Sequence, residues 1–369
     1  MSRICLNMIV KNEAHVIARC LASVRPFIDR WVIVDTGSTD GTQDLIRRLL
    51  ADVPGELHER PWRDFGHNRS EAIELARGQG DYLFTIDADE VLRLPEGFER
   101  PTLDADAYAL RVDYDNVRYD RVCLIDSRLP WRWVGVLHEY LECGRPIERP
   151  TLHGPIVQVH SDGARSQQDV HVKYAQDARV LEAALRDEPD NTRYTFYLAQ
   201  SYRDSGQNEA ALACYERRAA MGGWEEEIWF SLYSSALLAE KLQHPSGEVV
   251  ERYLRAFEQR PRRGGEALGQ LARYCREARR FASARLFATQ AMTVPLPEGD
   301  GLFVDRSWYL WRCRDEFAVA SYWSGDPEGC RRECLGLLAD PALPADQSER
   351  VRANLDFAER QLTATPGAR

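Results

Sequence analysis

The first 90 residues alternate short, mostly apolar segments with amphipathic stretches. The segments have the length of β-strands, and the stretches place their apolar residues on one face of a helix. The segments that predict strands are Ile4–Val10, Trp31–Val34, Glu56–Glu59 and Tyr82–Ile86. The stretches that predict helices are Ala14–Val24, Thr42–Leu50 and Asn68–Arg77. This alternation predicts an α/β fold, with a Rossmann-like, mostly parallel sheet that has helices on both faces.

Residues 105–165 show a different pattern, in which short apolar segments are broken by turn residues. The segments that predict further strands are Ala107–Asp113, Arg121–Ile125 and Ile156–His160. We expect these strands to complete the sheet and to wall a cleft.

From about residue 173 the strand pattern disappears and apolar residues recur at helical spacing. Residues 197–217 resemble a tetratricopeptide repeat, because small residues stand where paired helices approach each other closely. These small residues are Ala199, Gly206 and Ala211. A shift of 73 residues brings Ala199 onto Ala272, and a shift of 119 brings Gly206 onto Gly325. The second half therefore predicts an all-α array of irregular helical repeats.

The chain of 369 residues is long enough for two domains. We predict an α/β domain over residues 1–170 and a helical repeat domain over residues 171–369. Acidic residues outnumber basic ones by 58 to 48, which gives a net charge of −10. The chain therefore lacks the basic field that nucleic-acid binding requires, and we expect no nucleic-acid partner.

The hydropathy and the cysteines bear on the compartment. No apolar run reaches the roughly 18 residues that a membrane span needs, so we expect no membrane span. The nine cysteines form no C-x-x-C pair, and such scattered thiols are typical of a reducing compartment. We predict a cytoplasmic protein.

Polar residues follow three of the predicted strands, at Asn12-Glu13, Asp35 and Asp87-Ala-Asp89. Each cluster alone is explained by helix capping or turn formation. Ligands of open parallel sheets bind beyond the carboxyl ends of the strands. Because all three clusters fall at such ends, together they predict a ligand site at one edge of the sheet.

The Asp87-Ala-Asp89 pair adds a candidate metal site. Two carboxylates two residues apart on a turning chain can face one hard divalent cation and leave positions for phosphate oxygens. A cation there would neutralise a departing diphosphate.

Four segments together resemble the family 2 glycosyltransferases of the GT-A fold. They are Met8–Glu13, Val32–Thr42, Asp64–Arg69 and Ile86–Glu90. The chain is similar, more narrowly, to the bacterial branch with tetratricopeptide repeats in its C-terminal half, to which peptide S-glycosyltransferases belong. The motifs cover roughly residues 3–160, and the remainder resembles this branch in architecture only.

The resemblance implies an inverting transfer of a sugar from a nucleotide diphosphate, usually UDP, with Mn²⁺ or Mg²⁺. It also implies a role for each matching position. Glu13 and Asp35 contact ribose and base, Asp64 lies near the base, and Arg69 lies near the diphosphate. Asp87 lies near ribose and metal, and Asp89 ligates the metal. We place Asn12 and His138 with the nucleotide-sugar-binding residues. One departure is Thr36, where many relatives have a second acidic residue.

Members of the family frequently carry the catalytic base after a Trp-x-Gly stretch, which here runs from Trp131 to Glu139. We predict Glu139 as the general base, with the alternative that it is a polar strand end. Trp131 and Trp133 are expected to wall the sugar pocket, since aromatic faces pack well against a pyranose. His160 is a candidate third metal ligand, with a hydrogen-bonded surface residue as its alternative.

Other functions share fragments of these motifs. The segment 83–92 also fits the first motif of haloacid-dehalogenase-like phosphatases, but that function leaves Asp35 and the Asn12-Glu13 cluster without a role. Asp35-Thr-Gly-Ser38 mimics an aspartic-protease loop, but no second such loop exists for the required pair.

A non-catalytic adaptor that carries a decayed transferase domain is the alternative outside enzymes. Among enzymes, the repeats favour a peptide or protein acceptor, and a glycan or small-molecule acceptor is the alternative. The donor sugar, the linkage and the oligomeric state stay open.

Overall fold

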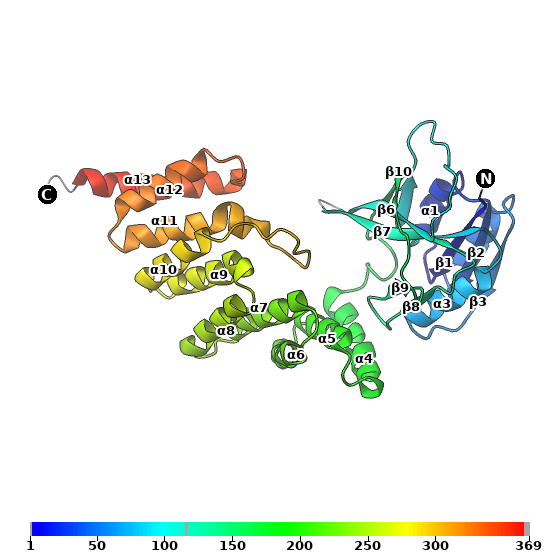
Figure 1. Ribbon diagram of the computed structural model, residues 1–369, viewed down its shortest axis with the longest axis horizontal. Helices are drawn as coiled ribbons and strands as arrows, with labels where there is room; N and C mark the ends of the chain where they lie inside the picture. Colours follow the sequence, from blue (N-terminus) through cyan, green and yellow to red (C-terminus); the bar gives the residue numbers. More distant parts are fainter. Residues whose placement is uncertain (1, 115–116, 365–369) are drawn as a thin grey trace. The chain divides into compact units, whose positions relative to one another are not determined.

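The first apolar segment of the chain forms strand β1 (Ile4–Val10) at the predicted bounds. In the computed structural model, which describes residues 2–114 and 117–364, β1 belongs to a mixed eight-stranded sheet of the order β3-β2-β1-β4-β7-β6-β10-β5 (Figure 1). Its other strands are β2 (Arg30–Asp35), β3 (Gly55–Glu59), β4 (Tyr82–Thr85), β5 (Glu90–Arg93), β6 (Ala107–Tyr114), β7 (Val117–Asp126) and β10 (Thr151–Val159). β1 to β4 pair in parallel, as predicted, whereas β7 and β5 pair antiparallel to their neighbours.

Alternating residues of β1 face two different helical layers. Ile4, Leu6 and Met8 join the buried residues of α1 (Ile17–Val24) and α2 (Thr42–Leu49) in one apolar cluster. Cys5 packs on the opposite face with α3 (Phe65–Ala76), and the Asn7 Nδ2 group donates a hydrogen bond to the Ala72 carbonyl there, at 2.8 Å. The sheet therefore lies between helices on both faces, which confirms the predicted α/β class.

Three strands were not predicted from the sequence. β5 extends the sheet, and β8 (Arg132–Val134) and β9 (Tyr140–Glu142) form a separate two-stranded ribbon. All three are only three or four residues long, and so short a segment has no detectable hydrophobic period.

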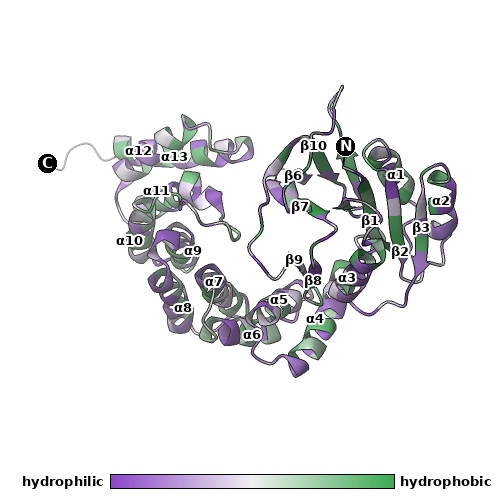
Figure 2. Ribbon diagram, turned by 45° about the vertical axis from the view of Figure 1, so that its right-hand side comes forward, coloured by the Kyte–Doolittle hydropathy of each residue, from purple (hydrophilic) through white to green (hydrophobic). Residues whose placement is uncertain are grey.

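The chain divides into two compact units, residues 1–187 and 188–369. The sequence placed the boundary after residue 170, and the difference is helix α4 (Val170–Asp187), which is helical in pattern but belongs to the first unit. Figure 2 shows strands β1 and β2 in hydrophobic colours and both colours on α4.

The second unit is built from helices that each pack against the next one along the chain. They are α5 (Thr192–Asp204), α6 (Asn208–Ala220), α7 (Glu225–Lys241), α8 (Ser246–Gln259), α9 (Gly264–Glu277), α10 (Phe281–Met292), α11 (Cys313–Trp323), α12 (Pro327–Leu338) and α13 (Ser348–Ala364). Ala199, Ala211 and Ala272 are fully buried at these contacts. Gly206 and Gly325 both have φ = 83° in the turns after α5 and α11, a conformation that favours glycine. The predicted repeat architecture is confirmed.

Among the described residues, no helix is both long enough and apolar enough to cross a membrane. All nine cysteines are free and buried.

Candidate active site

A cavity of about 660 Å³ opens at the carboxyl ends of β1 and β4 in the first unit. It is lined by the predicted site residues Asn12, Glu13, Asp64, Arg69, Asp87, Asp89, His138 and Glu139. The position agrees with the general rule for open α/β sheets. The structure thus brings together residues from both ends of the first 140 positions.

The wall after β1 and β2 is a turn held by side-chain hydrogen bonds. Asn12, at φ = 58°, accepts a hydrogen bond from the Thr39 amide through Oδ1, and its own amide donates to Ser38 Oγ, both at 2.8 Å. Asp35 is buried behind this wall, where its Oδ1 accepts from the amides of Gly37 and Ser38. Its Oδ2 accepts no hydrogen bond within the part of the chain that the structure describes. Asp35 therefore shapes the turn rather than lining the cavity.

Glu13 is held at both its backbone and its side chain. Its amide donates to Thr42 Oγ1 at 2.9 Å, and its Oε2 accepts from the Ala164 amide at 3.2 Å. Burial raises the pKa of the Glu13 carboxyl above its usual value, and Asp89 and Asp87 raise it further, against the effect of the Ala164 hydrogen bond. Several carboxylates thus crowd one part of the cavity.

Arg69, on α3, lies between two of the predicted functional carboxylates. Its Nη2 donates to Asp87 Oδ1 at 2.7 Å, and its Nε lies 2.8 Å from Glu139 Oε1. The guanidinium is 5.2 Å from the centre of the Trp133 ring. Desolvation opposes the charge of Asp87, but Arg69 and Arg121 outweigh it and hold the Asp87 pKa below its usual value. Arg69 therefore fixes Asp87 and the predicted base relative to each other.

A second arginine, Arg121, supports Asp87 indirectly through Glu90, and the sequence did not single it out. Arg121 on β7 makes a two-pronged ion pair with Glu90, at 2.8 and 2.7 Å. Glu90 Oε2 in turn accepts a hydrogen bond from the Asp87 amide at 3.0 Å. The signal in the sequence was Glu90 directly after the Asp87-Ala-Asp89 motif, but its partner Arg121 lies 31 residues further along the chain.

Asp89 is half-buried and lines the cavity. Its Oδ2 accepts from the Gly163 amide at 3.3 Å. Burial raises the pKa of the Asp89 carboxyl, and the charge on Asp87 raises it further. Burial and the Asp87 charge thus both disfavour the ionised form of the Asp89 carboxyl.

These carboxylates fit a divalent cation in part. Asp87 and Asp89 supply hard oxygen ligands on one turn, and the raised pKa values of Glu13 and Asp89 indicate excess negative charge that a cation would offset. His160 is exposed, does not line the cavity, and contacts Asp89 through the backbone, where its amide donates to the Asp89 carbonyl at 3.3 Å. In the described ranges, no three His, Cys, Asp or Glu residues form a metal-ligating group, so Asp87, Asp89 and His160 are not assembled into one.

Two tryptophans differ in their placement. Trp131 was expected to wall the sugar pocket, and this prediction is wrong, because Trp131 is buried in the apolar cluster under α3 and its Nε1 donates to the Asp126 carbonyl. Trp133 is half-buried beside Arg69 and does not line the cavity. An aromatic residue at strand spacing does not reveal which face of the strand it occupies.

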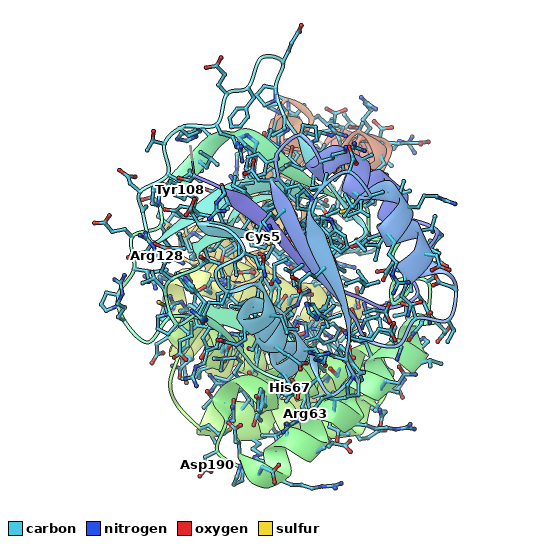
Figure 3. All side chains as sticks on the ribbon, turned by 90° about the vertical axis from the view of Figure 1, so that its right-hand side faces the viewer. Cys5, Arg63, His67, Tyr108, Arg128 and Asp190 are labelled. Carbon is cyan, nitrogen blue, oxygen red and sulfur yellow. The ribbon has the colours of Figure 1, made fainter. Side chains whose placement is uncertain are left out.

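The segment before α3 carries two further cavity residues, Trp62 and Arg63. Asp64 caps this helix, and its Oδ1 accepts from the His67 amide at 2.7 Å. Arg63 and His67, both labelled in Figure 3, lie on either side of this cap. Trp62 and Arg63 also line the cavity, as does α4 through Lys173, Asp177 and Val180. Sequence analysis missed this second part of the cavity because it placed residues 171–187 in the repeat domain.

Comparisons with known proteins indicate which family the first unit resembles. Residues 5–95 match the family described as Glycosyl transferase family 2. The chain is 28% identical over 275 residues to the TPR repeat-containing protein Synpcc7942_0270 of Synechococcus elongatus, covering 70% of this chain and 67% of that protein. It is 24% identical over 224 residues to the SPbeta prophage-derived glycosyltransferase SunS of Bacillus subtilis, covering 56% and 50%. It is also 35% identical over 86 residues to the lipopolysaccharide core biosynthesis glycosyltransferase LpsC of Rhizobium meliloti, covering 23% and 31%.

The chain thus spans about two thirds of the first of these relatives, half of the second and a third of the third. The family match includes β1 to β4 and the Asp87-Ala-Asp89 turn. The chain therefore combines a region that matches the family 2 glycosyltransferases, residues 5–95, with a helical region that resembles tetratricopeptide repeats.

Proposed function

We propose that the chain is an inverting, metal-dependent glycosyltransferase that takes a sugar from a UDP-sugar. The observation that carries this proposal is the single cavity in which the family 2 motif residues Glu13, Asp87 and Asp89 meet Glu139. Those residues come from segments far apart in the sequence, and helix capping alone does not explain why they converge.

Glu139 is the proposed general base. Its side chain is 13% exposed, lines the cavity, and is oriented by Arg69. In the proposed step, the acceptor oxygen or sulfur forms a bond to the anomeric carbon on the face opposite the diphosphate. The bond from that carbon to the diphosphate oxygen breaks, and the acceptor proton passes to the Glu139 carboxylate. One such displacement inverts the anomeric configuration.

Asp89, with Asp87, is the proposed site for Mn²⁺ or Mg²⁺. A bound divalent cation would supply charge neutralisation for the departing diphosphate. Asn12, Glu13 and Asp64 are proposed to hold the nucleotide, because all three line the cavity and lie within the family match, and Asn12 borders the turn after β2. The buried Asp35 would act by holding that turn in place.

The proposed acceptor is a peptide or protein side chain that the helical repeats recruit. Repeat arrays provide extended surfaces on which protein segments bind. The names of two relatives, SunS and LpsC, describe glycosyltransferases, and LpsC is described as acting in lipopolysaccharide core biosynthesis. A glycan acceptor is therefore the competing proposal. We also propose a cytoplasmic location, which suits nine buried thiols.

The test is transfer from a panel of radiolabelled UDP-sugars to a peptide library and to a glycan library, with MnCl₂ or with EDTA. Glu139→Gln should lower kcat by about 10²–10⁴-fold for a hydroxyl acceptor. The affinity for UDP should change little, since Glu139 is proposed to act on the acceptor. Transfer in EDTA at the full rate would contradict the metal assignment. UDP binding without hydrolysis or transfer of any donor would favour the adaptor.

A further inference from the structure

The cavity of the first unit has a further set of lining residues, here called the outer part, beside the proposed nucleotide contact Asp64. It is bounded by Trp62 just before α3, by Phe65 at the start of α3, and by α4, through Tyr174 and Val180. This outer part is continuous with the part that holds Glu139 and Asp89. A molecule placed there would therefore share one cavity with the proposed base.

An ion pair connects the two walls of this outer part. The Arg165 guanidinium lies over the Phe65 ring, 4.7 Å from its centre, and pairs with the buried Asp177 of α4. Burial raises the pKa of the Asp177 carboxyl, against the effect of Arg165. Arg165 thus fastens α4 to the segment at the start of α3.

The chemistry of the exposed surface identifies the occupant. Several charged groups here have partners, since Arg165 pairs with Asp177, Lys173 lies over Tyr174, and Asp64 accepts from the His67 amide, whereas Arg63 is largely exposed. Large apolar side chains stay accessible: Trp62 is 41% exposed and Val180 is 39% exposed. Burying such surface against an apolar group is favourable.

Two exposed amides complete the outer part. Gln168 and Gln176 line it, and each side chain offers both donors and an acceptor. A polypeptide backbone presents the matching alternation of N–H and C=O groups.

We propose that Trp62 and the Val180 face of α4 form an acceptor subsite for a polypeptide that carries a large apolar side chain beside the glycosylated residue. This inference rests on the proposed transferase function and specifies its acceptor. It also gives α4 a role in the catalytic unit, separate from any recruitment by the repeats.

The test compares two exposed valines of the same helix. Val180 lines the cavity, whereas Val172, which is 51% exposed, does not. Val180→Asp and Val172→Asp are therefore matched variants of equal chemistry. A second pair is Trp62→Ala and Trp224→Ala, since Trp224 is a similarly exposed tryptophan in the other unit. Thermal melting of all four establishes that they fold.

The acceptor probes are two pools of short synthetic peptides with a central Ser, Thr or Cys. The donors are UDP-sugars, and MnCl₂ is present throughout. One pool has Leu, Ile and Phe beside the centre, and the other has Gly, Asn and Gln. The full-length protein should label the apolar pool about tenfold faster at subsaturating peptide, as expected when one apolar side chain is buried. Val180→Asp and Trp62→Ala should remove that preference through a higher KM for peptide, while Val172→Asp and Trp224→Ala should keep it.

The outcomes separate the subsite from the wider function. Equal labelling of both pools, or equal behaviour of Val180→Asp and Val172→Asp, would overturn the subsite while leaving the transferase in place. Labelling of oligosaccharides in preference to both pools would overturn it in favour of a glycan acceptor. If the unaltered protein failed to bind UDP by calorimetry and to cleave any UDP-sugar, the proposed function itself would fail.

Discussion

Arg69 shows how one residue can set the geometry of two others. Its guanidinium lies between Asp87 and Glu139, and only 15% of its side chain is exposed. Removing one partner of a buried ion pair leaves an uncompensated charge. Arg69 is therefore needed to keep the proposed base and the proposed metal-binding aspartate in one arrangement. The motif match identified Arg69 but not this position, because Glu139 belongs to a different, later segment.

The charge on Asp89 should lower the stability of the folded state, although Asp89 is proposed to support the reaction. Because burial and Asp87 raise its pKa, the folded state disfavours its charge, and this penalty is fully present at neutral pH. Asp89→Asn should therefore raise the melting temperature at pH 7, on the order of 2 °C, while abolishing transfer. The gain should shrink as the pH falls through the folded pKa, where Asp89 becomes neutral in the folded state, and should vanish below the unfolded pKa. Calorimetry across pH 4–8 measures it.

Asp162 provides the matched control of opposite sign. Its pairing with Arg19 lowers its pKa, so its charge stabilises the folded state above the unfolded pKa. Asp162→Asn should lower the melting temperature slightly at pH 7, by less than the gain in Asp89→Asn, because both partners are well exposed. A lower melting temperature for Asp89→Asn as well would contradict the repulsion argument.

At the scale of elements, α3 and the segment after β8 approach each other unusually closely. A Cβ atom on Gly66 would lie 2.3 Å from the Gly135 carbonyl oxygen. The Phe65 amide donates to the Val136 carbonyl at the same contact. This contact positions the segment that ends in Glu139.

Gly66→Ala should therefore impair both stability and catalysis. Neither backbone can yield cheaply, so we expect a loss of about 1–3 kcal/mol in the free energy of unfolding, as for other overpacked sites. The kcat should fall together with it, because Glu139 must shift. Gly247→Ala in α8 is the control, since a Cβ there meets nothing within 4 Å. Urea unfolding that gave the same stability for both variants would show that the contact is not tight.

How far the sequence predicts these elements depends on their length and on their partners. The bounds of β1 were predictable because its apolar run is seven residues long and both of its flanks are polar. α3 begins at Phe65 rather than Asn68, because Asp64 caps it and extends it toward the chain start. The antiparallel pairing of β4 with β7 joins distant segments, and no local pattern encodes it.

At the scale of the whole molecule, the two compact units should unfold as separate transitions. Ligands stabilise only the unit that binds them. UDP with MnCl₂ at about 100 times its Kd should stabilise residues 1–187 by about 2.7 kcal/mol and leave the transition of residues 188–369 in place. Scanning calorimetry of the full chain, with fragment 188–369 melted alone to identify its transition, measures this. Equal shifts of both transitions would instead indicate one cooperative unit.

The site as a whole was only partly predictable. Motif order located the residues after β1, β2 and β4, because strand ends of a parallel sheet converge. The outer part of the cavity was missed, since α4 has the same helical pattern as the repeats that follow it. Trp131 was expected to wall the sugar pocket and His160 to ligate the metal, but neither residue lines the cavity. A strand pattern does not show which side chains face inward.

The buried cysteines can report how often each unit of the chain unfolds locally. Burial raises the pKa of the thiols of Cys5 in the first unit and of Cys214 and Cys313 in the second to about 12 each. Thiolates are the reactive form, so an alkylating reagent can modify these sites only when the surrounding structure opens. The rate at which each cysteine is alkylated, followed by mass spectrometry, therefore reports how often its neighbourhood unfolds. Natural side chains of both units thus act as reporters, and no label has to be introduced.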